Sequence, residues 1–122
     1  MLTYEQAEIL ARTWVELISG GKAALMPEAT RDKPYGWVFF WQSKQFIKRR
    51  DLRYSLVGNA PIIVDRFAGE IRVTGTAKST DEYLAEYERT LPPARLSMRP
   101  QPHDRVRPGD DPNTNGTSRQ PS

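Results

Sequence analysis

The 122-residue sequence contains no cysteine and a single histidine, His103. Without cysteine the chain cannot form a disulfide bond, a thiolate metal site or a thiol nucleophile, and a reducing compartment suits it best. His103 lies in a polar, proline-rich C-terminal stretch, where we expect no preorganised acid–base or metal site. Glycines with phosphate-loop spacing are also missing. These absences predict a protein that is not an enzyme and uses no cofactor or metal.

Long hydrophobic runs are absent too. No apolar stretch approaches the roughly 18 residues of a membrane span. The N-terminus, Met1–Glu5, lacks the basic region and apolar core of a signal peptide. The net charge of +3 is too small by itself to indicate nucleic-acid binding. We therefore expect a soluble cytoplasmic protein without membrane contact.

The composition changes sharply after Leu91. Seven of the ten prolines fall in residues 92–122, where the only large aliphatic side chains are Leu96, Met98 and Val106. Ordering such a segment costs about 1 to 2 kcal/mol per residue in backbone entropy, which three aliphatic side chains cannot offset. The sequence therefore predicts one domain over residues 1–91 and a disordered tail over residues 92–122.

Helices are expected at both ends of the domain. Thr3 with Gln6, and Ser79 with Glu82, have the spacing of a capping box, which marks a helix N-terminus. The first helix should end at Gly20 and bury one apolar stripe, formed by Ala7, Leu10, Ala11, Trp14, Leu17 and Ile18. The apolar side of the second helix is formed by Tyr83, Leu84 and Tyr87.

The densest signal is aromatic. Residues 35–41 contain five aromatic side chains, and a strand would place Trp37, Phe39 and Trp41 on one face and Val38 and Phe40 on the other. Both faces are therefore apolar. This pattern predicts a central strand that is buried on both sides, or one whose second face meets a partner.

Weaker patterns complete the order of elements. Residues 23–29 predict an edge strand interrupted by Pro27, and residues 45–51 a short helical turn. Residues 62–64 and 71–73 predict a hairpin, closed by a turn from Asp65 to Gly69. Runs of strands bounded by helices favour an α+β domain, with a small antiparallel sheet of about four strands and the N-terminal and C-terminal helices packed on one face.

The strongest local charge follows the aromatic strand. Five basic residues lie within ten positions, namely Lys44, Lys48, Arg49, Arg50 and Arg53. Such a cluster is either a solvated turn, a docking patch for an acidic protein, or a nucleic-acid contact. Phe67 is a further candidate contact residue, because an apolar ring is unexpected in the hairpin turn, unless it folds back onto the sheet.

Two pairs of residues could imitate a catalytic arrangement. Asp65 and Glu70 could approach each other across the hairpin turn, although Asp65 also suits a turn cap and Glu70 a solvated position. Ser43 and Lys44 are adjacent, and adjacent residues on a strand point to opposite faces. Neither pair changes the expectation of a non-enzymatic protein.

Five segments in order carry a resemblance to a known family: Leu2–Ala7, Lys33–Phe40, Gly58–Asp65, Thr74–Ala77 and Tyr83–Glu88. They resemble the immunity protein 35 family, also described as YrhB-type domains, over about residues 1–90. Phe67 and Ala68 depart from a turn that is more often polar in the family. The proline-rich tail lies outside the resemblance.

The resemblance implies a small bacterial cytoplasmic protein, classed among the immunity proteins of polymorphic toxin systems. It brings no assigned catalytic or binding residues. The leading hypothesis is therefore a binding module that neutralises a cognate toxin. The resemblance also implies an alternative, a chaperone-like protein that holds unfolded clients. A nucleic-acid-binding module is a third and lesser alternative, which depends on the basic cluster.

Overall fold

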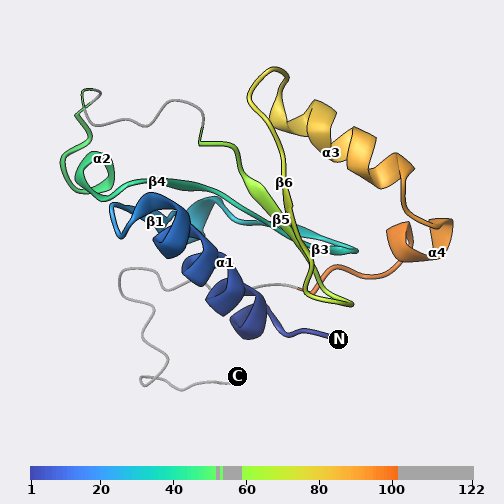
Figure 1. Ribbon diagram of the computed structural model, residues 1–122. Coiled ribbons are helices and arrows are strands. Elements are labelled where there is room, and N and C mark those ends of the chain that lie inside the picture. The colour runs from blue at the N-terminus through green and yellow to red at the C-terminus, as the bar shows by residue number, and fades with distance from the viewer. Residues whose placement is uncertain (52, 54–58, 102–122) are drawn as a thin grey trace.

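The computed structural model describes residues 1–51, 53 and 59–101. Strands in the middle of the molecule are covered by helices (Figure 1). The elements in chain order are α1 (Tyr4–Ser19), β1 (Ala23–Leu25), the 3-10 helix η1 (Pro27–Ala29), β2 (Arg31–Lys33), β3 (Gly36–Phe39), β4 (Trp41–Ser43), α2 (Lys44–Arg49), β5 (Ile62–Asp65), β6 (Ile71–Val73), α3 (Thr80–Arg89) and α4 (Pro93–Leu96). The expected α+β class is confirmed. His103 and the rest of residues 102–122 lie outside the described residues.

All strand pairs are antiparallel. Four strands form one sheet in the order β2-β3-β5-β6, and β1 pairs with β4 in a second, two-stranded sheet. The aromatic run is divided between β3 and β4 at Phe40, whose carbonyl accepts a hydrogen bond from the Met26 amide at 2.8 Å. The strand expected over residues 23–29 is wrong beyond Leu25, because Pro27 begins a 3-10 helix instead.

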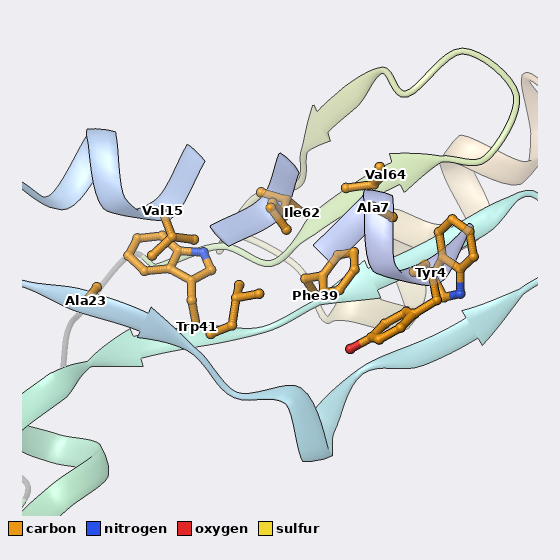
Figure 2. Packing of buried hydrophobic residues seen from close by; sticks show 11 residues of the cluster. Tyr4, Ala7, Val15, Ala23, Phe39, Trp41, Ile62 and Val64 are labelled. Atoms are coloured by element: carbon orange, nitrogen blue, oxygen red, sulfur yellow. The ribbon is translucent and has the colours of Figure 1, made fainter. Parts of the chain in front are cut away.

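One face of β3 and β5 packs against α1. Trp37 lies opposite Val64 and Phe39 opposite Ile62, and these four side chains are almost fully buried. Figure 2 shows Phe39, Trp41 and Ile62 close to side chains of α1, including Ala7 and Val15. The aromatic strand is thus the central strand of the core, as its pattern predicts.

The opposite face packs against α3. Val38 and Ile63 form a second buried cluster with Leu84 and Tyr87 of α3 and with Tyr35. The helices therefore cover opposite faces, and the expectation that both lie on one face is wrong. The physical reason is that β3 and β5 are apolar on both faces, so each face needs its own cover.

Helix α1 begins with the predicted capping box of Thr3 and Gln6. Its buried face is formed by Tyr4, Ala7, Ala11 and Val15. The predicted stripe is wrong at Leu10, Leu17 and Ile18, which are 37%, 75% and 50% exposed. Small side chains at two buried positions let the helix lie close to the aromatic strand, while the Tyr4 ring stacks on Phe39 with 6.0 Å between centroids. With this face of α1 packed on the sheet, Leu17 faces the solvent.

The hairpin of β5 and β6 is confirmed, with Ile62 paired to Val73. In its turn the Asp65 carboxylate accepts the Ala68 amide at 2.9 Å, and Gly69 has a left-handed φ of 74°. The second predicted capping box is also present, between Ser79 and Glu82 at the start of α3. Local polar signals thus gave the correct helix and turn boundaries.

Residues 92–101 contact the end of the sheet at a few positions, although most of their side chains are exposed. They include α4, and the Gln101 carbonyl accepts a hydrogen bond from the Trp37 indole at 3.0 Å. These contacts are made by backbone carbonyl groups, so the side-chain composition of the segment does not predict them. The division into a domain of residues 1–91 and a tail of residues 92–122 stays a prediction.

Candidate functional site

Four of the five predicted basic residues lie on α2 or at its C-cap. Ser43 caps the helix, since its hydroxyl accepts the Phe46 amide at 3.0 Å. Lys48 and Arg49 are exposed in the last turn, where cations interact favourably with the helix dipole. Arg50 follows with a left-handed φ of 55°, and its guanidinium lies 5.8 Å from the centroid of the Phe46 ring.

Two of the basic side chains are paired with carboxylates. Lys44 Nζ lies 3.9 Å from Glu16 Oε2 of α1. The Arg53 guanidinium donates to both carboxylate oxygens of Asp51, and these hydrogen bonds hold the pKa of Asp51 below its usual value. The basic cluster is therefore a real surface feature, but its field is weaker than the count of five cations suggests.

An apolar groove lies on α1, next to this cluster. It has a volume of about 340 Å³ and is lined by Ile9, Arg12, Thr13, Glu16 and Leu17. Ile9 and Leu17 are 63% and 75% exposed. Positions four residues apart share one side of a helix, and Ile9, Thr13 and Leu17 lie opposite the face that packs on the sheet.

The pair between Lys44 and Glu16 joins the groove to the basic helix. We call the groove residues together with α2 the α1–α2 surface. Its centre is apolar and its rim is charged, which is the usual arrangement of a protein–protein interface. Sequence reasoning missed Ile9 as an exposed residue. The signal was the excess of apolar positions on α1, which is more than one buried stripe can hold.

Phe67 lies apart from this surface. It sits in the turn between β5 and β6, close to residues 92–101, which we call the C-terminal segment, whereas α2 lies at the opposite end of the molecule from α4 (Figure 1). The Phe67 ring is half-buried between two guanidinium groups, with Arg95 at 4.3 Å and Arg66 at 5.9 Å from its centroid. The structure does not bring Phe67 together with the five basic residues.

The residues of the two pairs that could imitate a catalytic site, Asp65 with Glu70 and Ser43 with Lys44, have structural roles. The buried Asp65 carboxylate caps its turn and lies 3.5 Å from the Arg95 guanidinium, while the exposed Glu70 faces Arg72 at 3.6 Å. Ser43 is a helix cap. Among the residues that the structure describes, no cluster of acidic or histidine side chains could hold a metal ion. No helix in the described part of the chain is long and apolar enough to cross a membrane.

The model of the immunity protein 35 family matches residues 5–90, which run from α1 through α3. The chain belongs to the immunity protein 35 family. The resemblance in the sequence motifs is thereby confirmed, and membership supports an immunity-protein role in general terms. The match includes the α1–α2 surface and the hairpin, and it ends before the C-terminal segment.

The chain is also similar to the "Uncharacterized protein YrhB" of Escherichia coli (strain K12). The two are 45% identical over 53 residues, which cover 43% of this chain and 56% of the relative. The match thus spans little more than half the length of that relative. No solved structure matches the chain.

Proposed function

We propose that this protein is a binding module that forms a one-to-one complex with a cognate bacterial toxin domain in the cytoplasm and blocks its active site or its access to substrate. The observation that carries the proposal is the α1–α2 surface, an exposed apolar groove beside a basic helix, in a chain of an immunity protein family. Catalysis plays no part in this function, because stoichiometric binding is enough to neutralise an enzyme.

The chemistry of the surface indicates its partner. Ile9 and Leu17 would be buried at the centre of the complex, where a few apolar anchors supply most of the binding free energy. Lys48, Arg49 and Arg50 would lie at the rim and attract an acidic toxin surface, which raises the association rate more than the final affinity. The partner is therefore a toxin domain with an apolar patch bordered by acidic residues.

Co-expression tests this proposal. The cognate toxin domain is expressed in a sensitive host with the wild-type protein, with Leu17→Glu, and with Ala85→Glu as the control on the exposed side of α3. We expect growth with the wild type and with Ala85→Glu, and loss of growth with Leu17→Glu. Failure of the wild type to restore growth or to form a complex would overturn the proposal.

The exposed apolar side chains also favour a second candidate function. Ile9, Leu17 and Ile18 are each at least half exposed, and a chaperone-like protein needs such a surface to hold unfolded clients. This function predicts that the protein suppresses the heat aggregation of several unrelated proteins. Inactivity towards all of them would remove this candidate and leave the toxin complex.

A further inference from the structure

Two backbone carbonyl groups of the C-terminal segment accept hydrogen bonds from side chains at the end of the sheet. The Arg99 carbonyl accepts a hydrogen bond from Arg66 Nη1 at 2.9 Å, and the Gln101 carbonyl accepts one from Trp37 Nε1 at 3.0 Å. Pro100 lies between these two residues and has no amide hydrogen to donate. Both donors contact carbonyl groups, so these two contacts do not depend on which side chains stand at positions 99 and 101.

Arg66 is the unusual member of this site. The residue is only 8% exposed, and its Nη1 atom donates to the Pro34 carbonyl at 3.1 Å as well as to Arg99. Its Nε atom is buried and has no hydrogen-bond partner. Among the described residues no carboxylate lies within 4.0 Å of the Arg66 guanidinium. A buried cation normally has a counter-ion, because an unpaired buried charge is costly.

The surroundings of Arg66 add positive charge. The C-terminal segment itself carries Arg95 and Arg99. The carboxylate of Asp65, which precedes Arg66 in the chain, lies 3.5 Å from the Arg95 guanidinium. Asp65 is thus paired with Arg95 and not with Arg66. The ligand chemistry that complements Arg66 is a carboxylate, which can accept from Nε and from a terminal nitrogen of the same arginine at once.

We propose that Arg66 and Trp37 form a docking site for an extended acidic segment of a partner protein, and that residues 99–101 occupy this site in the free protein. The two oxygens of a partner carboxylate accept from Nε and from a terminal nitrogen of Arg66, and they add a negative charge that a carbonyl lacks. A nearby backbone carbonyl of the partner accepts the Trp37 indole hydrogen. The identity of the partner as the toxin rests on the proposed function, whereas the site itself does not.

A pair of peptides separates the carboxylate from the rest of the segment. Both have the sequence of residues 94–99, so that the peptide ends where Arg99 offers its carbonyl to Arg66. One ends in a free carboxylate and the other in an amide. Each is titrated into the full-length protein, and the indole N–H resonance of Trp37 reports displacement of Gln101.

We expect the acid peptide to bind about tenfold or more tightly than the amide, since charge-assisted hydrogen bonds are roughly twice as strong as neutral ones. The preference should disappear in Arg66→Gln and persist in the control Arg72→Gln, which changes an exposed arginine on β6. Arg66→Lys keeps the charge without the planar fork and should retain only part of the preference. If Arg66→Gln does not fold, the test uses Arg66→Lys instead.

Equal binding of the two peptides, or a preference that survives Arg66→Gln, would overturn the docking site. Absence of binding by either peptide at millimolar concentration would overturn it as well. None of these results affects the toxin complex proposed above, because its test is growth rescue through the α1–α2 surface. Conversely, failed rescue with an intact acid preference would leave the docking site standing without a toxin as its partner.

Discussion

The indole nitrogen of Trp37 donates a hydrogen bond at 3.0 Å to the carbonyl of Gln101, which lies 64 residues further along the chain. The same ring meets Tyr4 of α1 edge to face, with 6.1 Å between centroids. One residue of the central strand thus holds both the first helix and the C-terminal segment. The aromatic run is the core of the domain, and its polar edge is where the C-terminal segment attaches.

Replacing Trp41 tests the energetic importance of the aromatic strand. Trp41 is buried, meets Trp14 edge to face at 5.9 Å, and donates to the Ala60 carbonyl at 2.8 Å. Trp41→Ala should lower the free energy of unfolding by about 3 to 5 kcal/mol, because it leaves a cavity and removes a donor from a carbonyl. Urea denaturation measures this loss. The control Leu17→Ala changes an exposed side chain and should stay within about 0.5 kcal/mol of the wild type.

Gly36 tests the close approach of neighbouring strands. It has a φ of 153°, and a Cβ atom there would overlap the Val64 carbonyl oxygen of β5. Gly20 also has a positive φ, at 61°, but a Cβ atom there would meet no other atom within 4 Å. Gly36→Ala should therefore lower the melting temperature far more than Gly20→Ala, which carries only the conformational cost of about 1 to 2 kcal/mol. Equal losses would contradict the strand packing.

The capping box of α3 predicts a dependence of stability on pH. Hydrogen bonds with Ser79, chiefly from its backbone amide to the Glu82 carboxylate at 3.1 Å, hold the pKa of Glu82 below its ordinary value. This stabilisation is fully present above the unfolded pKa of about 4.3 and is lost as the pH falls through the lower folded pKa. Wild type should therefore lose stability relative to Glu82→Gln on acidification, as measured by urea unfolding at each pH.

The other capping box provides a reciprocal control. Gln6 occupies the same position in α1 and does not titrate, and its side chain accepts the Thr3 amide at 3.0 Å. Gln6→Glu should introduce the same loss of stability at low pH that Glu82→Gln removes. If neither substitution changes the pH dependence, the carboxylate in the α3 cap has no measurable effect.

We expect no sequence-independent binding of single-stranded nucleic acid. Binding of this kind requires exposed aromatic rings on which bases stack, and Trp37, Phe39 and Trp41 are all buried. Lys44 and Arg53 in the basic cluster also face carboxylates. Fluorescence anisotropy at low salt should therefore show no binding. Affinity that falls steeply with salt and weakens in the double variant Arg49→Ala, Arg50→Ala would contradict this expectation.

Local signals in the sequence predicted much of the fold. The capping boxes at Thr3 and Ser79, the turn from Asp65 to Gly69 and the alternation of residues 37–41 each depend on neighbouring residues, and the structure confirms them. The apolar content of both faces of the aromatic strand also predicted cover on two sides, although the helices were expected on one.

Other features depend on contacts between distant residues. The buried face of α1 was mispredicted because the helix has more apolar positions than one stripe, and the fit of Ala7 and Ala11 against the aromatic strand decides which are buried. The contacts of Arg99 and Gln101 use backbone carbonyls, which leave no trace in side-chain composition. The α1–α2 surface was therefore half predicted, through its basic residues, and its apolar groove was found only in the structure.

We propose above that the α1–α2 surface binds the toxin. The most direct measurement is a calorimetric titration of the purified cognate toxin domain with the full-length protein, with Leu17→Glu and with Ala85→Glu. We predict a one-to-one complex that Leu17→Glu weakens about tenfold or more and that Ala85→Glu leaves unchanged. Absence of a complex, or equal affinity of the wild type and Leu17→Glu, would contradict the claim.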